Sequence, residues 1–287
     1  MPDAPPPVAK PPSGARNLVL VILDSLRYDS WLEAGPTTAA ALGQVERRFS
    51  YASWTAPSHV NLLMGLLPHT NPREVYASEY YKQDFGRYSE RLGVSGIEFR
   101  SFLPSLFLPT YLKHSLGYAN HARVSMPVLN EHTVINRDFD SYLLMPRHND
   151  MAAMLDTLHF DPERPSFCLL NVGETHYPYA LPTEDPGMWP RISGVHGVFK
   201  HLDEQDGPDA PEFFDRTALR ELHGRQIKTV EYIDTVLARL FDLLPSNTWV
   251  VVTSDHGELF GEERFFGHGP IAHEKVFEVP FVEGLVP

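Results

Sequence analysis

Three uninterrupted apolar runs stand out in the pattern of hydrophobic and polar positions along the chain. They cover residues 17–23, 166–172 and 248–253 and consist mostly of valine, leucine and isoleucine. Because they lack the alternation of a half-exposed strand, we predict strands buried on both faces, as in a parallel sheet covered by helices. Polar or ionisable residues follow each run directly. In open α/β sheets, ligands bind at this carboxyl edge.

Apolar positions at helical spacing predict a long helix near residues 214–244, which Pro245 ends. The same reading predicts shorter helices at 37–47, 57–64, 109–116 and 149–158. Strands that alternate with helices indicate an α/β fold with a largely parallel sheet. Residues 177–211 are rich in proline, glycine and aspartate, and we predict a long loop excursion over the active edge.

Composition narrows the class of protein. Of the 287 residues, 43% are hydrophobic and 21% charged, which permits a large core and excludes wholesale disorder. Acidic residues outnumber basic ones by 37 to 24, for a formal net charge of -13. We therefore expect no nucleic-acid-binding surface and no attraction to anionic membranes. No apolar run approaches the roughly 18–20 residues of a membrane span, so none is expected.

The first residues differ from the rest of the chain, because they are rich in proline and lack the apolar core of a signal peptide. We predict a flexible segment over residues 1–16, then a single domain over 17–287 with a short C-terminus. The only cysteine, Cys168, excludes an internal disulfide and a multi-cysteine zinc site. These features predict a cytoplasmic location.

Candidate metal ligands follow two of the apolar runs. Asp255 and His256 could face one divalent cation together, since a carboxylate and an imidazole supply oxygen and nitrogen ligands. His268 lies beyond a loop rich in glycine and acidic residues that could fold back over the site. Asp24 ends a different buried strand, where an unpaired carboxylate would cost several kcal/mol and a metal would remove that cost. The plain alternatives are a surface turn at Asp255 and a helix N-cap at Asp24.

A candidate nucleophile precedes the helix predicted for residues 57–64. Pro57 suits the first helical position, so Thr55 would lie near the positive end of the helix dipole. Its hydroxyl could merely cap the helix. As a metal-bound alkoxide with a lowered pKa, it would instead be a nucleophile.

Eight motifs, taken in order, resemble those of the alkaline phosphatase superfamily, in particular its sulfatase-like branch. They are VILD at 21–24, TAPSH at 55–59, MGLLPHT at 64–70, LK to GY at 112–118, THYPY at 175–179, SDHGE at 254–258, GHG at 267–269 and EVPF at 278–281. The first two resemble the first metal-binding strand and the nucleophile motif. The resemblance implies a three-layer α/β/α sandwich with a largely parallel central sheet.

The departures from the family are informative. Sulfatases carry a cysteine or serine, converted to formylglycine, where Thr55 stands here, so a formylglycine-dependent sulfatase is not expected. Their arginine is replaced by His59, and no Gly-Lys-Trp-His element follows Tyr118. Threonine nucleophiles occur in phosphorus-handling members of the superfamily: nucleotide phosphodiesterases, phosphoethanolamine transferases and lipoteichoic acid synthases.

The resemblance thus implies a metal-dependent hydrolase or group transferase of phosphoesters, phosphodiesters or phosphonates, with a phospho-threonine intermediate and a small anionic ester as substrate. Asp24, Thr55, Asp255 and His256 would bind one divalent ion, Zn²⁺ or Mn²⁺ before Mg²⁺ or Ca²⁺.

The same resemblance implies further roles in substrate binding and proton transfer. His268 and His176 would hold phosphoryl oxygens or protonate the leaving group. His59, Asn61 and Lys275 would contact the substrate anion.

Three alternatives stay open. A second metal, which is less expected, would need His176, His268 and either Asp29 or Glu174 as ligands. The chain could be a sulfoester hydrolase that works without formylglycine. It could also be a non-catalytic member of the family that binds an anion or serves as a scaffold.

Overall fold

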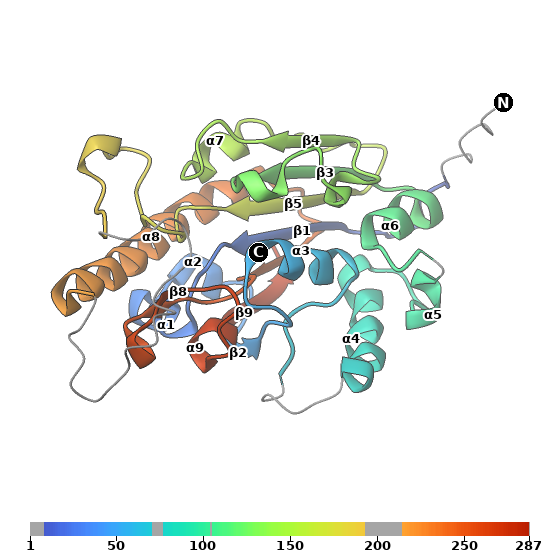
Figure 1. Cartoon of the computed structure of the whole chain (residues 1–287). Coiled ribbons are helices and arrows are strands. Elements are labelled where there is room, and N and C mark those ends of the chain that lie inside the picture. The colour runs from blue at the N-terminus through green and yellow to red at the C-terminus, as the bar shows by residue number, and fades with distance from the viewer. Residues whose placement is uncertain (1–8, 71–76, 104, 193–213, 287) are drawn as a thin grey trace.

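The computed structural model describes residues 9–70, 77–103, 105–192 and 214–286, with only the backbone for 77–83. Its centre is a seven-stranded sheet in the order β2-β9-β6-β1-β5-β3-β4 (Figure 1). The strands are β1 (Asn17–Leu23), β2 (Glu46–Phe49), β3 (Ala119–Val124), β4 (Ser141–Leu144), β5 (Ser166–Val172), β6 (Thr248–Thr253) and β9 (Glu278–Leu285). The five strands from β6 to β4 run parallel, whereas β9 is antiparallel to β6 and β2 to β9. The predicted α/β fold with a largely parallel sheet is confirmed.

Helices cover both faces of this sheet. The helices are α1 (Tyr28–Ala34), α2 (Thr37–Ala40), α3 (Thr55–Leu63), α4 (Ala77–Leu92), α5 (Phe99–Phe102), α6 (Leu108–Leu116), α7 (Met151–Leu155), α8 (Arg216–Leu243) and α9 (Glu274–Phe277). A separate two-stranded ribbon, β7 (Leu259–Phe260) with β8 (Phe266–Gly267), follows β6.

The central strand β1 shows why the domain has three layers. Successive side chains of a strand point to opposite faces, so Leu20 and Ile22 enter one core while Val19 and Val21 enter the other. The first core contains side chains of α3, α4 and α6, and the second contains those of α1 and α8. All of these β1 residues are fully buried, which explains the uninterrupted apolar run.

The register of the parallel strands brings their carboxyl ends level. Ile22 pairs with Thr253 of β6, and Leu23 pairs with Val172 of β5. The residues that follow these strands therefore meet at one edge of the sheet. The candidate functional site lies at this edge.

Some predicted helix bounds were wrong. The helix predicted for 37–47 ends at Ala40, because Gly43 takes a backbone φ of 153° and the chain then extends into β2, which pairs with β9. The helix predicted for 149–158 is reduced to α7, with Asp150 as its side-chain cap. Helix α3 begins at Thr55, so Pro57 occupies its third position and not its first.

The two segments predicted to be irregular are described only in part. Residues 1–8 of the proline-rich segment lie outside the described residues, while Arg16 is hydrogen-bonded through its backbone to Leu92 and Tyr118. Of the predicted loop excursion 177–211, residues 193–211 also lie outside them. Within the described part of the chain, no helix has both the length and the apolar composition to span a bilayer.

Candidate active site

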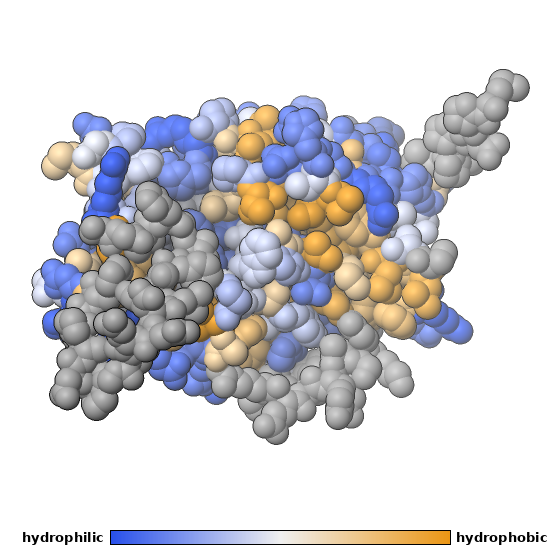
Figure 2. All heavy atoms as spheres, in the orientation of Figure 1, coloured by the Kyte–Doolittle hydropathy of each residue, from blue (hydrophilic) through white to orange (hydrophobic). Residues whose placement is uncertain are grey.

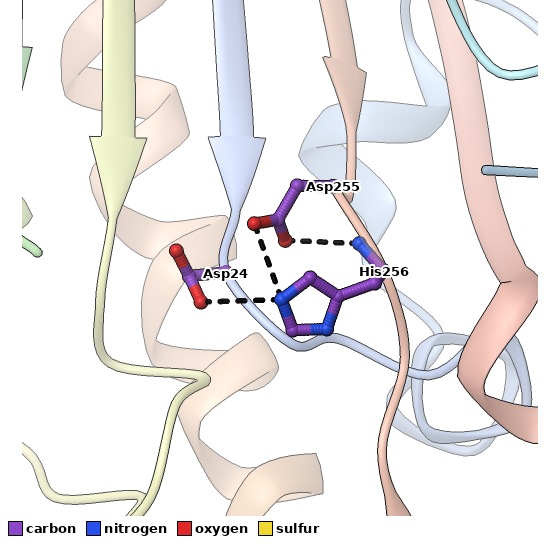
Figure 3. Close-up of side chains that lie close together, drawn as sticks. All are labelled: Asp24, Asp255 and His256. Atoms are coloured by element: carbon purple, nitrogen blue, oxygen red, sulfur yellow. Dashed lines mark hydrogen bonds and ion pairs between the residues drawn. The ribbon is translucent and has the colours of Figure 1, made fainter. Parts of the chain in front are cut away.

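Four side chains predicted as metal ligands meet at the carboxyl edge of the sheet. Asp24 follows β1, Asp255 and His256 follow the adjacent β6, and Thr55 opens α3. One ligand atom from each of Asp24, Asp255 and His256 lies within 4.8 Å of the others (Figure 3). The hydroxyl of Thr55 lies 3.4 Å from Asp24 Oδ1 and 3.4 Å from His256 Nε2. Sequence reasoning thus selected residues that the fold gathers at one point.

The imidazole of His256 is oriented by its own backbone neighbour. Its Nδ1 lies 2.9 Å from the carbonyl oxygen of Gly257, which can only accept, so Nδ1 carries the proton. The lone pair of Nε2 then faces the carboxylates, 3.4 Å from Asp255 Oδ2 and 4.0 Å from Asp24 Oδ1. A backbone hydrogen bond that fixes the tautomer in this way is typical of metal-binding histidines.

The carboxylates of Asp24 and Asp255 are both buried, but they differ in their hydrogen-bond partners. Oδ1 of Asp255 accepts backbone N–H groups of Ser25 at 3.1 Å and His256 at 3.0 Å, whereas its Oδ2 is buried without any hydrogen-bond partner among the described residues. Burial and the neighbouring charge of Asp24 raise the pKa of Asp255 well above its ordinary value. Burial also opposes ionisation of Asp24, but nearby histidines, with a hydrogen bond from Asn171, hold its pKa below the ordinary value.

These observations fit a divalent cation. A buried carboxylate oxygen without a donor costs free energy unless a cation or proton satisfies it. The donor set consists of carboxylate oxygens, one imidazole nitrogen and one hydroxyl, which suits borderline and hard divalent ions. Asp24, Thr55, Asp255 and His256 are the residues that would hold it.

Sequence reasoning missed a residue that positions Asp24. The side chain of Asn171, in β5, donates to Asp24 Oδ2 at 2.8 Å and accepts the backbone N–H groups of Ser125 and Met126, both at 3.1 Å. Asn171 is fully buried within an otherwise apolar strand. That lone amide in an apolar run is the signal that could have found it, because buried amides need partners.

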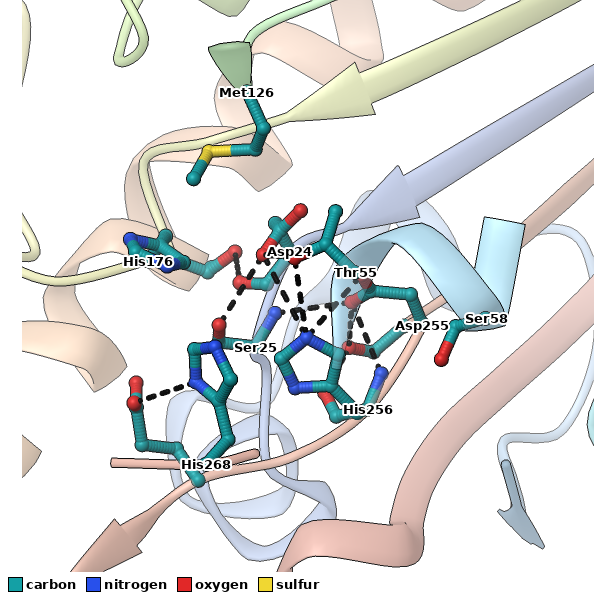
Figure 4. A network of polar contacts seen from close by, with 12 residues as sticks. Asp24, Ser25, Thr55, Ser58, Met126, His176, Asp255, His256 and His268 are labelled. Atoms are coloured by element: carbon teal, nitrogen blue, oxygen red, sulfur yellow. Dashed lines mark hydrogen bonds and ion pairs between the residues drawn. The ribbon is translucent and has the colours of Figure 1, made fainter. Parts of the chain in front are cut away.

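His268 and His176 lie beside the ligand cluster, as Figure 4 shows. The His268 ring lies 4.2 Å from the ring of His256 and 5.4 Å from that of His176, centroid to centroid. His176 Nδ1 donates to the carbonyl oxygen of Tyr177 at 2.9 Å, which leaves its Nε2 as the acceptor. The structure therefore brings both predicted histidines to the site.

Glu258 is a second residue whose role the sequence did not reveal. One of its carboxylate oxygens lies 2.9 Å from His268 Nδ1, and the other accepts the hydroxyl of Tyr179 at 2.6 Å. Burial lowers the pKa of His268, but the charge and hydrogen bond of Glu258 outweigh it, so the net pKa is raised. With Nδ1 bound to Glu258, Nε2 of His268 is the nitrogen left for substrate.

The three residues predicted to contact the substrate anion each bond to other groups of the protein. His59 is fully buried, and its Nδ1 donates to the carbonyl oxygen of Thr55 at 2.9 Å and lies 3.7 Å from Asp255 Oδ2. Asn61 donates back to its own helix, to the carbonyl oxygen of Pro57. Lys275 is ion-paired with Asp29 at 3.1 Å and Glu278 at 3.2 Å, neither of which belongs to the ligand cluster.

The residues predicted to hold a second metal are not gathered into one group in the described part of the chain. Asp29 is ion-paired with Arg27 and Lys275, and Glu174 accepts the backbone N–H of Met151 at the start of α7. Among the described residues, Asp24, Asp255 and His256 form the one group of three or more possible ligands.

Comparison with known proteins decides the family. The model of the Sulfatase family matches residues 16–282. The chain belongs to the sulfatase family. The resemblance of its motifs to the sulfatase-like branch of the alkaline phosphatase superfamily is thereby confirmed. No curated protein matches the sequence.

Solved structures related to this sulfatase-family chain share its fold at low identity. The C-terminal periplasmic domain of EptC from Escherichia coli, in complex with Zn, has a TM-score of 0.58 at 15% identity and covers 99% of this chain and 77% of that one. The soluble domain of lipooligosaccharide phosphoethanolamine transferase A from Neisseria meningitidis has a TM-score of 0.52 at 14% identity. The match covers 96% of this chain and 80% of that one. A 2-O GAG sulfatase has a TM-score of 0.53 at 13% identity. The match covers 94% of this chain and 64% of that one. Family and neighbours support a sulfatase-like ester hydrolase or transferase.

Proposed function

We propose that this protein is a metal-dependent hydrolase or group transferase of phosphorus esters, with Thr55 as the nucleophile. One observation carries the proposal: the Thr55 hydroxyl lies 3.4 Å from both Asp24 Oδ1 and His256 Nε2, beside the partnerless Oδ2 of Asp255. A threonine that only capped its helix would not need a buried carboxylate and an imidazole beside its oxygen. Phosphoethanolamine transferase A among the structural neighbours is consistent with a phosphorus ester, and the threonine at position 55, where sulfatases carry cysteine or serine, favours phosphorus over sulfur.

A bound metal would supply positive charge beside Thr55. A divalent cation held by Asp24, Thr55, Asp255 and His256 would lower the pKa of the threonine hydroxyl and stabilise negative charge on the transferred group. The imidazole and carboxylate ligands favour Zn²⁺ or Mn²⁺, and the Zn complex of the EptC domain is consistent with this choice.

The chain's own residues then account for the reaction. The Thr55 hydroxyl gives up its proton to solvent, and its oxygen attacks phosphorus in line. The new O–P bond forms as the bond to the leaving oxygen breaks, and His268 Nε2 supplies the proton that this oxygen needs. Water or an acceptor alcohol next attacks the phospho-threonine, gives its proton to the now neutral His268, and restores Thr55.

A rate panel with matched variants tests the proposal. Turnover of p-nitrophenyl phosphate, its bis-ester, a p-nitrophenyl phenylphosphonate and p-nitrophenyl sulfate is measured with Zn²⁺ and with Mn²⁺. Thr55→Ala is expected to lower phosphorus-ester turnover at least about 10³-fold. Thr235→Ala, which removes an exposed threonine hydroxyl of α8, serves as the control. In a quenched reaction, mass spectrometry should locate a phosphoryl adduct at Thr55.

Two other outcomes would favour the alternatives. Turnover of the sulfate alone would identify a sulfoester hydrolase without formylglycine. No turnover of any ester, together with thermal stability unaffected by divalent ions or chelator, would identify a non-catalytic anion-binding member, because a bound metal stabilises the native state.

A further inference from the structure

A cavity of about 480 Å³ lies between the beginning of α8 and the ribbon of β7 and β8. Its lining includes three apolar side chains and three guanidinium groups: Phe214, Leu219 and Phe260 with Arg216, Arg220 and Arg264. Helix α8 begins at the left of Figure 1, and Figure 2, in the same orientation, shows hydrophilic residues in blue at this end of the molecule. Cavities of several hundred Å³ are the size that small organic ligands occupy.

The cavity is positively charged although the chain is acidic. The formal net charge of the chain is -13, yet the described lining holds three arginines and one acidic residue, Glu262. The carboxylate of Glu262 is already ion-paired with the buried Arg27 at 2.5 Å. The described lining therefore carries an excess of positive charge, which attracts anions.

Arg220 offers a guanidinium group to this cavity. It is exposed, and its Nε donates to the carbonyl oxygen of Arg216 at 3.2 Å. Among the residues that the structure describes, no carboxylate pairs with it. A guanidinium group matches a carboxylate or phosphate through parallel hydrogen bonds, and the apolar side chains beside it can contact the body of the molecule that carries the anion. The cavity thus suits an organic oxyanion on an apolar body.

Both walls of the cavity are held in place without a ligand. Gly261, just after β7, takes a backbone φ of 109°, and a Cβ there would lie 2.9 Å from Leu219 Cδ1, so the ribbon packs closely on α8. The Arg27 guanidinium that binds Glu262 also lies over the ring of Phe260, 5.4 Å from its centroid. A preformed site loses less free energy in ordering when a ligand binds.

The ribbon connects this cavity to the proposed proton donor. Glu258 directly precedes β7 and His268 directly follows β8, whereas Phe260 and the turn after it line the cavity. Phe260 pairs with Phe266, which lies two residues before His268, or about 7 Å along a strand. A molecule about 10 Å long can therefore extend from His268 to the cavity.

The role of His268 decides which part of the substrate extends this way. In the proposed reaction His268 protonates the leaving oxygen, so the leaving group lies on the side of the ribbon. We propose that the cavity binds a carboxylate or similar oxyanion at the far end of that leaving group, and that Arg220 is the residue that selects it. This selectivity rests on the proposed function, because it concerns a part of the substrate of the same reaction.

A kinetic measurement compares two leaving groups that differ in one remote charge. Esters of 7-hydroxycoumarin-4-acetic acid and of its carboxamide are prepared in the phosphorus-ester class that the rate panel finds active. The kcat/KM of the carboxylate is expected to exceed that of the carboxamide at least about tenfold. Arg220→Gln should lower this ratio about tenfold, whereas Arg239→Gln, which removes an exposed guanidinium from the same helix, should leave it unchanged. Equal kcat/KM values for the two esters in the parent protein would overturn the proposal.

A binding measurement on metal-stripped protein does not depend on turnover. The free leaving groups, 7-hydroxycoumarin-4-acetate and its carboxamide, are titrated in a calorimeter. The carboxylate is expected to bind at least about tenfold more tightly than the carboxamide, and Arg220→Gln should weaken its binding about tenfold. Arg220→Lys keeps the charge but not the planar fork, so it should recover part of this affinity. A carboxylate held by His268 instead would bind Arg220→Gln and Arg239→Gln equally, and that result would overturn the proposal.

The outcomes separate this proposal from the proposed function. If no phosphorus ester is turned over but the carboxylate still binds through Arg220, the proposed function fails and the anion site stands. If esters are turned over through Thr55 but the ratio in Arg220→Gln equals that in Arg239→Gln, the anion site fails and the function stands. Thermal unfolding of each arginine variant shows whether it is folded.

Discussion

Glu258 joins His268 to Tyr179 through one buried carboxylate, accepting Nδ1 of the histidine at 2.9 Å and the hydroxyl of the tyrosine at 2.6 Å. Its charge and hydrogen bond raise the pKa of His268 against the effect of burial. The histidine therefore keeps its acidic proton to higher pH than an isolated imidazole would.

Replacing Glu258 by glutamine should shift the pH profile. The amide removes the charge that raises the His268 pKa, so protonated His268 is lost at lower pH and the alkaline limb of kcat/KM moves down the pH scale. Above neutrality the rate should fall about tenfold or more. Tyr179→Phe removes the other partner of Glu258 and should leave the alkaline limb nearly in place. An unmoved limb in Glu258→Gln would show that His268 does not supply the proton.

Asp255→Asn should separate metal binding from stability. In the metal-free protein the pKa of Asp255 is raised above its unfolded value, so its favourable contribution to stability is lost as pH rises through the folded pKa. The asparagine variant should therefore be more stable than the metal-free parent at about pH 8, by on the order of 1–3 kcal/mol, and less dependent on pH. Zn²⁺ should also stabilise this variant less than it stabilises the parent protein.

Thermal unfolding with chelator and with Zn²⁺, between about pH 5 and about pH 8, measures both effects. A variant that gains as much from Zn²⁺ as the parent would remove Asp255 from the ligand set.

Asn171→Ala should weaken metal binding without removing a ligand. The change leaves Asp24 Oδ2 without its amide donor and the backbone N–H of Met126 without its acceptor, whereas the N–H of Ser125 keeps the backbone oxygen of residue 171. Loss of such an outer partner typically costs about 10–100-fold in metal affinity. Competition against a chelator of known affinity measures the change, and Asn247→Ala, where the amide bonds only an exposed backbone oxygen, is the control. Equal affinities in the two variants would contradict the positioning role.

Arg91→Met tests a buried charge network far from the ligand cluster. Arg91 is 0% exposed and donates to Glu283 at 2.7 Å and to Asp84 at 3.1 Å. Removing the cation leaves two carboxylates without it, so the free energy of unfolding should fall by about 3–5 kcal/mol. Arg87 bonds the same Glu283 from a side chain that is 39% exposed, and Arg87→Ala should cost less than about 1 kcal/mol. Chemical denaturation compares the two, and equal losses would contradict the argument from burial.

Much of the site could be predicted because its residues follow apolar runs. Asp24 and the Asp255–His256 pair were found from their place after buried strands, and parallel strands bring such places together. Thr55 was found from a motif, and the structure supplied its distance to the carboxylates.

Glu258 was not assigned a role because no local pattern encodes its pairing with Tyr179, which lies on another segment. The lone amide of Asn171 marks a buried polar group in an apolar strand, but its partner Asp24 lies on another strand. The helix predicted for 37–47 ran into the first two residues of β2, whose pairing partner β9 lies more than 200 residues further along. The cytoplasmic location stays a prediction.

The order of strands in the sheet has a consequence for synthesis. Strand β1 lies between β5 and β6, and Ser25 meets Asp255 across 230 residues of sequence. A nascent chain therefore carries Asp24 and Thr55 long before the ribosome has made Asp255 and His256. Until β6 emerges, one edge of β1 has free backbone hydrogen-bonding groups, and such an edge can pair with other chains. Metal capture and protection of that edge thus arrive together, once β6 has been made.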